Sequence, residues 1–219
     1  LLASTWNTEL VKNVGVSIGS EAKSSGVDLV LGPGVNLHRH PLCGRNFEYY
    51  SEDPFLTGHI GAAMINGIES EGIGASPKHF AVNNQETSRN WNDAIVSERA
   101  LRELYLKSFK IIVKESQPWA IMTSYNKING SYAAENKRLL TDILRNKWDF
   151  KGLVMTDWYG GRNSTNIIKS GNDLIEPGTK NDWENLKKSA LDGSLPLLNI
   201  DKSVKRILTL VLKSQKMKN

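Results

Sequence analysis

The 219-residue sequence has 39% hydrophobic and 23% charged residues and a formal net charge of +5, as expected for an ordinary globular domain. No apolar run approaches the roughly 20 residues that cross a bilayer, and the opening residues lack the basic and apolar regions of a signal peptide. The lone Cys43 excludes an internal disulfide and multi-cysteine zinc sites but leaves the cellular compartment unassigned.

The first part of the chain predicts two helices and two strands in alternation. Asn7 is placed to cap a helix over 8–23, and the apolar segment 27–34 follows as a strand that ends in Gly-Pro-Gly. Asp53-Pro54 is typical of a helix start, because Asp caps well and proline suits the first helical position. The segment 73–83 is the second predicted strand.

The second part continues the alternation. Further helices are predicted over 98–116, 137–148 and 202–214, opened by Ser97, Asn136 and Asp201. Further strands are predicted over 119–126, 152–158 and 172–178. Continuous apolar strands separated by helices favour right-handed crossovers and an all-parallel sheet.

Polar side chains follow each predicted strand in turn: Arg45, the Lys78-His79 pair, Tyr125, Asp157 and Glu176. Such groups converge when a parallel sheet closes on itself, so we favour a (β/α)8 TIM-type barrel over an open, doubly wound α/β sheet. Only five strands are clear. Either some strands are disguised or the barrel is incomplete in this chain.

Asp157 stands where the fourth strand gives way to a loop. It could be a helix N-cap, but the Trp-Tyr-Gly-Gly that follows is a poor helix start. An exposed Trp158 suits the apolar C–H face of a sugar ring. We therefore favour a carboxylate with a chemical role, beside a sugar.

The other candidates also have simpler structural interpretations. Arg45 can pair with Glu48 and still offer its rigid fork of donors to sugar hydroxyls. Lys78 and His79 are neighbours, which point to opposite faces of a regular strand, so both reach one cavity only if the strand bends. His38 and His40 lack a third metal ligand, and no serine lies in a Gly-x-Ser-x-Gly elbow. We also find no phosphate loop and no nucleic-acid signature. We expect no metal, cofactor, nucleic-acid or membrane partner.

With the segments "GRNFEYYSEDP", "KHFAVNNQE", "MTSYNKING" and "LVMTDWYG" in this order, the sequence resembles the family 3 glycoside hydrolases of β-glucosidase type. The resemblance runs nearly end to end. It implies one N-terminal barrel domain over residues 1–219, without the family's first strands and without the α/β sandwich domain that follows.

The resemblance implies a retaining reaction on a β-glucoside or cello-oligosaccharide, with Asp157 as the nucleophile. The substrate-binding residues that it implies are Arg45, Lys78, His79, Tyr125, Trp158 and Met122. In the family, a second domain supplies the acid/base glutamate, so we expect that residue on a second domain or chain. Glu48, Glu86 and Glu176 are the candidates here, and none has a convincing context.

Three alternatives stay open at this point. The first is a β-xylosidase or another exo-β-glycosidase of the same family. The second is a Schiff-base lyase, in which Lys78 attacks a carbonyl after burial has lowered its pKa. The third is a sugar-binding fragment without catalysis.

Overall fold

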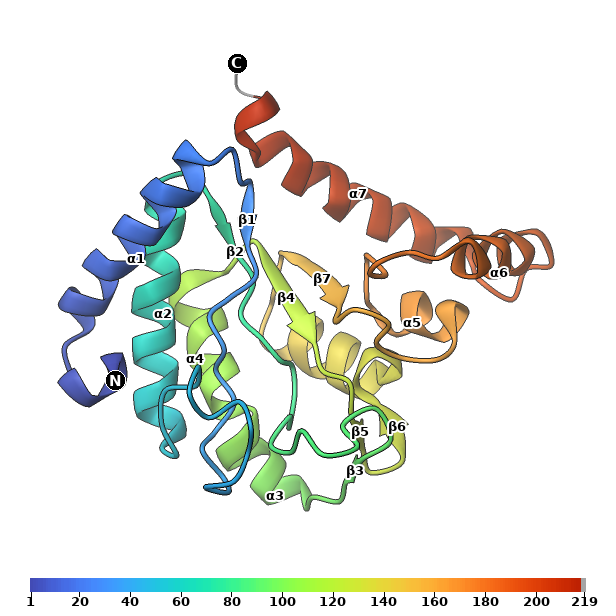
Figure 1. Cartoon of the computed structure of the whole chain (residues 1–219). Coiled ribbons are helices and arrows are strands. Elements are labelled where there is room, and N and C mark those ends of the chain that lie inside the picture. The colour runs from blue at the N-terminus through green and yellow to red at the C-terminus, as the bar shows by residue number, and fades with distance from the viewer. Residues whose placement is uncertain (218–219) are drawn as a thin grey trace.

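The computed structural model describes residues 1–217 and contains a parallel sheet partly enclosed by helices (Figure 1). β1 (Leu29–Val30) pairs with β2 (Gly74–Ala75), and β4 (Ala120–Thr123) pairs with β7 (Leu153–Thr156). Isolated parallel bridges extend the row: Gly34 with Lys78, Phe80 with Thr123 and Met155 with Leu174. The five predicted strand segments therefore lie side by side in chain order, as in a (β/α)8 barrel. The predicted α/β fold is confirmed, and the barrel is incomplete in this chain.

The predicted helices are present, two further helices over 164–170 and 180–191 were not predicted, and four of the predicted caps are made. The helical elements are α1 (Thr8–Ser24), α2 (Pro54–Ser70), α3 (Glu98–Ala100), a π-helical turn (Leu101–Tyr105), α4 (Lys107–Ser116), a π-helix (Arg138–Lys147), α5 (Ser164–Ser170), α6 (Lys180–Leu191) and α7 (Leu197–Lys213), with 3-10 turns at Leu2–Thr5, Ala133–Glu135 and Gln215–Met217. The side chains of Asn7, Asp53, Ser97 and Asn136 accept hydrogen bonds from backbone N–H groups one turn on. These caps satisfy N–H groups that have no partner within the helix.

The last helix begins earlier than predicted. α7 starts at Leu197, directly after Pro196, and Asp201 lies inside the helix rather than at its cap. Proline fixes φ near the helical value, so Pro196 can lead into a helix without a polar cap. Among the described residues, no helix is both long and apolar enough to span a membrane.

A small second sheet, not predicted from the sequence, lies in the loops that follow the strands. β3 (Asp93–Ala94) runs parallel to β5 (Lys127–Ile128), which pairs antiparallel with β6 (Ser131–Tyr132). It ties the loop after the second strand segment to the loop after β4.

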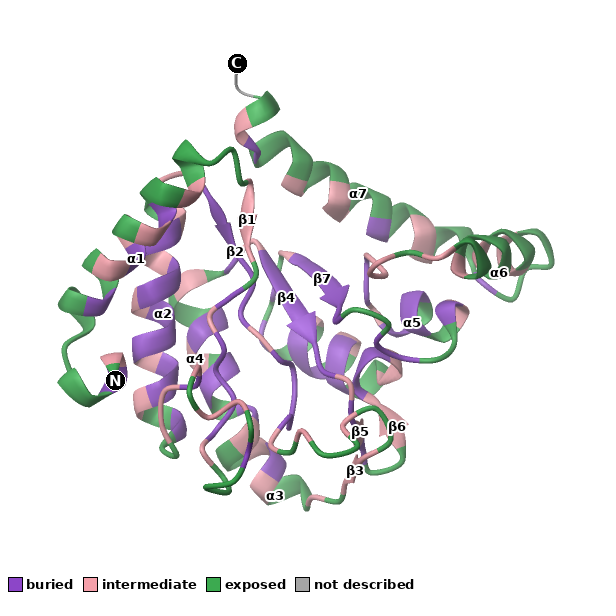
Figure 2. Ribbon diagram, in the orientation of Figure 1, coloured by how far each residue is buried: buried purple, intermediate pink, exposed green. Residues whose placement is uncertain are grey.

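The two faces of the main sheet pack into different clusters, because successive residues on a strand point to opposite sides. Ile121 and Val154 face the helices and belong to the large core, which fills the space beneath α1, α2 and α4. Met122 and Met155 face the other way, into a small apolar cluster that Ile207 and Leu210 of α7 partly cover. Figure 2 shows buried strands at the centre and a largely exposed α7.

Candidate active site

Asp157 follows β7 directly, and its carboxylate lies at the end of the parallel sheet. The backbone around it is fixed, since its N–H donates to Thr123 O (3.2 Å) and its carbonyl accepts from Gly160 N–H (2.8 Å). Oδ1 accepts from Trp158 N–H at 2.8 Å, and Oδ2 lies 3.6 Å from His79 Nε2. The next helix, α5, is capped by Asn163 instead. The carboxylate thus serves no helix start.

His79 is buried against Asp157 and is neutral. Burial, followed by the nearby cations Arg45 and Lys78, lowers its pKa to about 2. The contact with Asp157 is therefore not an ion pair. On the other side of the ring, Nδ1 lies 3.2 Å from the Tyr49 hydroxyl, and the His79 backbone N–H donates to Asn36 Oδ1 at 2.8 Å. Backbone and ring are both held, so the orientation of the imidazole is fixed.

Arg45 and Lys78 share the carboxylate of Glu48. Arg45 Nε donates to Glu48 Oε1, and Lys78 Nζ lies 3.9 Å from Glu48 Oε2. Burial lowers the pKa of Lys78, and the Glu48 charge opposes that shift. The pair predicted between Arg45 and Glu48 exists, and it leaves two cations close enough to affect His79 electrostatically.

Tyr125 completes the group around Asp157. Burial, and then the charge of Asp157, raise the pKa of Tyr125 to about 12, so the phenol stays protonated. The guanidinium of Arg89 lies over its ring, 4.4 Å from the centroid, and donates to Glu86 Oε2 at 2.8 Å. Sequence reasoning missed Arg89. The available signal was its place in "NNQETSRN", a polar loop that follows a strand end.

Trp158 and Met122 lie beside this polar group rather than inside it. Both line an apolar cavity of about 370 Å³ between the strands and α7, together with Glu176. Met122 is 3% exposed, whereas Trp158 is half exposed. The structure thus brings together Arg45, Lys78, His79, Tyr125 and Asp157, and it sets the other two predicted residues next to them. No cluster of three or more potential ligands for a metal ion occurs within residues 1–217.

Residues 1–210 match the family model described as "Glycosyl hydrolase family 3 N terminal domain". The chain belongs to glycosyl hydrolase family 3. It is 43% identical over 211 residues to thermostable beta-glucosidase B of Acetivibrio thermocellus, covering 96% of this chain and 28% of that protein. It is 44% identical over 214 residues to an exo-alpha-(1->6)-L-arabinopyranosidase of Bifidobacterium longum, covering 98% of this chain and 28% of that protein.

A solved family 3 structure has the same fold over the whole chain. Beta-glucosidase 3B from Thermotoga neapolitana, in complex with glucose, superposes with a TM-score of 0.98 at 48% identity, covering 100% of this chain and 32% of that one. The chain therefore spans about three tenths of the length of these relatives (28% and 32%).

Of the three glutamates considered as the acid/base, two bind cationic side chains and the third lies in the apolar cavity. Glu48 is shared by Arg45 and Lys78, and Glu86 binds Asn83 (3.1 Å) and Arg89. Glu176 is half-buried beside Trp158 in the apolar cavity, and burial raises its pKa. Glu48 and Glu86 are each paired with an arginine, so neither carboxylate is free to approach a leaving group.

Proposed function

We propose that this chain carries the nucleophile of an exo-glycosidase that removes terminal β-D-glucosyl residues from β-glucosides with retention of configuration. One observation carries the proposal: the Asp157 carboxylate stands at a strand end among neutral and cationic hydrogen-bond donors. Family membership and the β-glucosidase names of several relatives support the substrate class. In this proposal residues 1–219 form one barrel domain.

The reaction begins when Asp157 Oδ2 attacks the anomeric carbon as the bond to the leaving oxygen breaks. A carboxylic acid from a second domain or chain donates its proton to that oxygen. The same group then removes a proton from water, which displaces Asp157 and releases the sugar. Retention places the two carboxyl groups about 5–5.5 Å apart. Glu48 and Glu86 are held by arginines and Glu176 lies in the apolar cavity, so we place the acid/base on a second domain or chain. The relatives are about three times longer than this chain.

The chain's own side chains divide the remaining work. Lys78, Arg45 and Arg89 are cationic donors for ring hydroxyls. Tyr125 remains a neutral phenol next to the carboxylate. Trp158, half exposed beside Asp157, offers an indole face to the sugar ring. Bonds to hydroxyls that tighten as the ring flattens act on the transition state rather than on binding alone.

The direct test is replacement of Asp157 by Ala in the full-length protein, with turnover measured on an aryl β-glucoside. Loss of the nucleophile should lower the rate by far more than tenfold. A tenfold change corresponds to about 1.4 kcal/mol of activation free energy. A loss below tenfold removes Asp157 from this role. Intact-mass labelling by a 2-deoxy-2-fluoroglucoside, followed by peptide mapping, should place the label within residues 152–162.

A pentopyranoside is the second candidate substrate, because the Bifidobacterium relative is named for L-arabinopyranosides at nearly the same identity. Comparing aryl β-glucoside, β-xyloside and α-L-arabinopyranoside decides between them. Burial lowers the pKa of Lys78, as a Schiff-base route requires, but that route has less support because the relatives are named as glycosidases. Borohydride trapping on Lys78 would restore that alternative. Glucose binding without turnover or trapping would indicate a non-catalytic sugar-binding fragment.

A further inference from the structure

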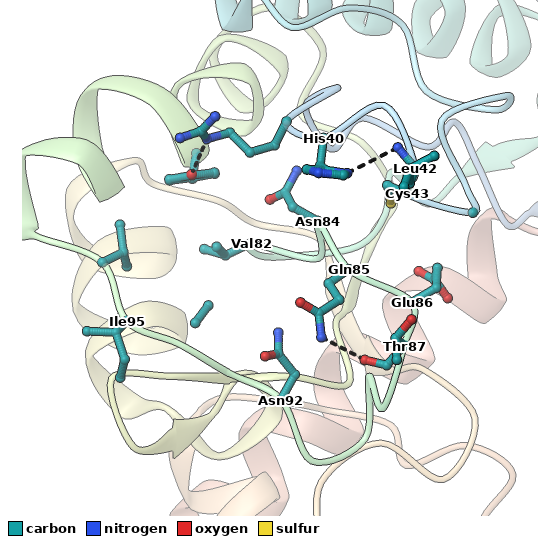
Figure 3. Close-up of a pocket in the computed structure, with 15 residues that line it drawn as sticks. His40, Leu42, Cys43, Val82, Asn84, Gln85, Glu86, Thr87, Asn92 and Ile95 are labelled. Carbon is teal, nitrogen blue, oxygen red and sulfur yellow. Dashed lines mark hydrogen bonds between the residues drawn. The ribbon is translucent and has the colours of Figure 1, made fainter.

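A cavity of about 760 Å³ lies next to the candidate active site and takes no part in the proposed reaction (Figure 3). It opens between the loop over residues 39–44, the loop over 82–96 and the side chain of Tyr105. The volume falls within the ~300–1,000 Å³ of small-molecule sites.

Amide side chains dominate the polar part of the cavity. Asn84, Gln85 and Asn92 point toward the open space in Figure 3. Asn84 donates to Leu37 O, and its Oδ1 is buried without a hydrogen-bond partner among the described residues. Gln85 Nε2 donates to Thr87 O at 2.8 Å, which leaves Oε1 as an acceptor. Gln85 and Asn92 thus offer both donors and acceptors, the combination that hydroxyl groups need, whereas Asn84 Oδ1 is itself buried.

The rest of the lining combines apolar side chains with one cation and one carboxylate. Val82 and Ile95 supply apolar surface, and Tyr105 supplies a ring whose hydroxyl accepts from Arg39 Nε at 3.2 Å. Arg39 and Glu86 are the cation and the carboxylate, and both oxygens of Glu86 already accept hydrogen bonds, from Asn83 and Arg89. A lining of this kind suits a neutral ligand with many hydroxyls and an apolar face better than it suits an anion or a metal ion.

Glu86 lies between this cavity and the candidate active site and contacts residues of both. Glu86 lines the cavity, while its carboxylate accepts from Arg89, whose guanidinium lies over Tyr125. Asn83, which also donates to Glu86, donates to the Tyr49 hydroxyl at 3.2 Å, and Tyr49 contacts His79. The two sites share a wall but no lining residue among those that surround Asp157.

We propose that this cavity is a second binding site for a neutral pyranose sugar, separate from the site at Asp157. Its occupant is either a free monosaccharide or a further unit of a bound oligosaccharide. The inference rests on the proposed function only for the identity of the sugar.

The test is equilibrium dialysis of radiolabelled glucose and cellotriose against the full-length protein. With free glucose as the occupant, the parent protein shows two classes of site. Gln85→Leu combined with Asn92→Leu weakens one class at least tenfold, and Lys78→Ala weakens the other. Asn90→Leu, the same kind of change on an exposed amide of this loop outside the cavity, leaves both classes intact. With an oligosaccharide unit as the occupant, glucose shows one class, and cellotriose loses affinity in both the double variant and Lys78→Ala.

A different pattern overturns the proposal. If the double variant binds glucose and cellotriose as the parent does, the cavity is not a sugar site. Failure of the proposed function looks different, because then Lys78→Ala has no effect on either ligand. Turnover of an aryl β-glucoside by the double variant should stay within about twofold of the parent, since neither residue touches the group around Asp157.

Discussion

The His79 Nε2 atom lies 3.6 Å from Asp157 Oδ2, and the imidazole that makes this contact is uncharged. Its other nitrogen faces the hydroxyl of Tyr49, which in turn accepts from Asn83 Nδ2. Nδ1 also lies 3.3 Å from Asn36 Oδ1, which can only accept. With Tyr49 donating to Nδ1, the ring proton is on Nε2 and faces the carboxylate; we assign this tautomer because Asp157 is the charged acceptor. At 3.6 Å the contact is longer than a hydrogen bond, so His79 presents a neutral N–H to Asp157 without a short bond.

Replacing His79 separates its donor role from any titration. His79→Phe removes the N–H that faces Asp157 at 3.6 Å, and a loss of about 1 kcal/mol would lower kcat/KM several-fold. His79→Gln keeps a neutral N–H donor and should lose less. Because burial holds the pKa of His79 near 2, both limbs of the pH profile of kcat/KM should coincide in the parent and the Gln variant. A limb that moves by more than half a pH unit would show that His79 itself titrates.

The row of strands was predicted well from the sequence, because buried parallel strands consist of continuous apolar runs. The sequence also indicated the polar residues at strand ends, since position after an apolar run is visible without coordinates. It did not indicate Arg89, which reaches Tyr125 only because the loop over residues 82–96 folds back across the site. Nor did it place Met122 in the apolar cluster below α7, since that depends on which face of β4 the helix covers.

Asp173 should be among the most sensitive carboxylates for stability. Its fully buried side chain accepts from Arg145 at 2.6 Å and Arg206 at 2.8 Å, and it also accepts from Val154 N–H at 2.9 Å. Breaking a buried ion pair leaves uncompensated charge, so Asp173→Asn should lower the free energy of unfolding by about 3–5 kcal/mol. Urea denaturation measures the loss.

The matched control for Asp173 is Asp149→Asn. Asp149 pairs with Lys151, and both side chains are well exposed, at 66% and 73%. Exposed pairs contribute about 0–1 kcal/mol, so this variant should unfold almost as the parent does. Asp173 connects Val154 of β7 with Arg206 of α7. Equal losses in the two variants would mean that these contacts do not stabilise the fold.

Gly67 of α2 should not tolerate a side chain. A Cβ at this position would lie 2.1 Å from Lys12 O and 2.9 Å from Gly15 Cα, both backbone atoms of α1. The two helices would have to separate, although Ala is the better helix former. Gly67→Ala should destabilise the protein by about 1–3 kcal/mol, the usual cost of overpacking. Asn66→Ala, at the adjacent half-buried position, is the control in thermal unfolding. A Gly67→Ala variant as stable as the parent would contradict this packing.

Glu69 should make stability depend on pH in the direction opposite to a paired surface acid. Its carboxylate accepts from Trp119 N–H (2.8 Å), directly before β4, and from Ala75 N–H (3.1 Å), in β2. Burial nevertheless raises its pKa from 4.5 to about 7. Between these values the folded state binds more protons than the unfolded chain, so the free energy of unfolding falls as pH rises.

A rise of the pKa from 4.5 to about 7 sets an upper bound of about 3 kcal/mol on this loss. Urea denaturation at pH 5 and pH 8 should show the parent losing stability relative to Glu69→Gln, whose amide does not titrate. Glu71→Gln changes the formal charge equally two residues away and serves as the control. If the stability difference between the parent and Glu69→Gln is the same at both pH values, the Glu69 carboxylate is ionised throughout this range. Its two backbone hydrogen bonds would then outweigh the cost of burial.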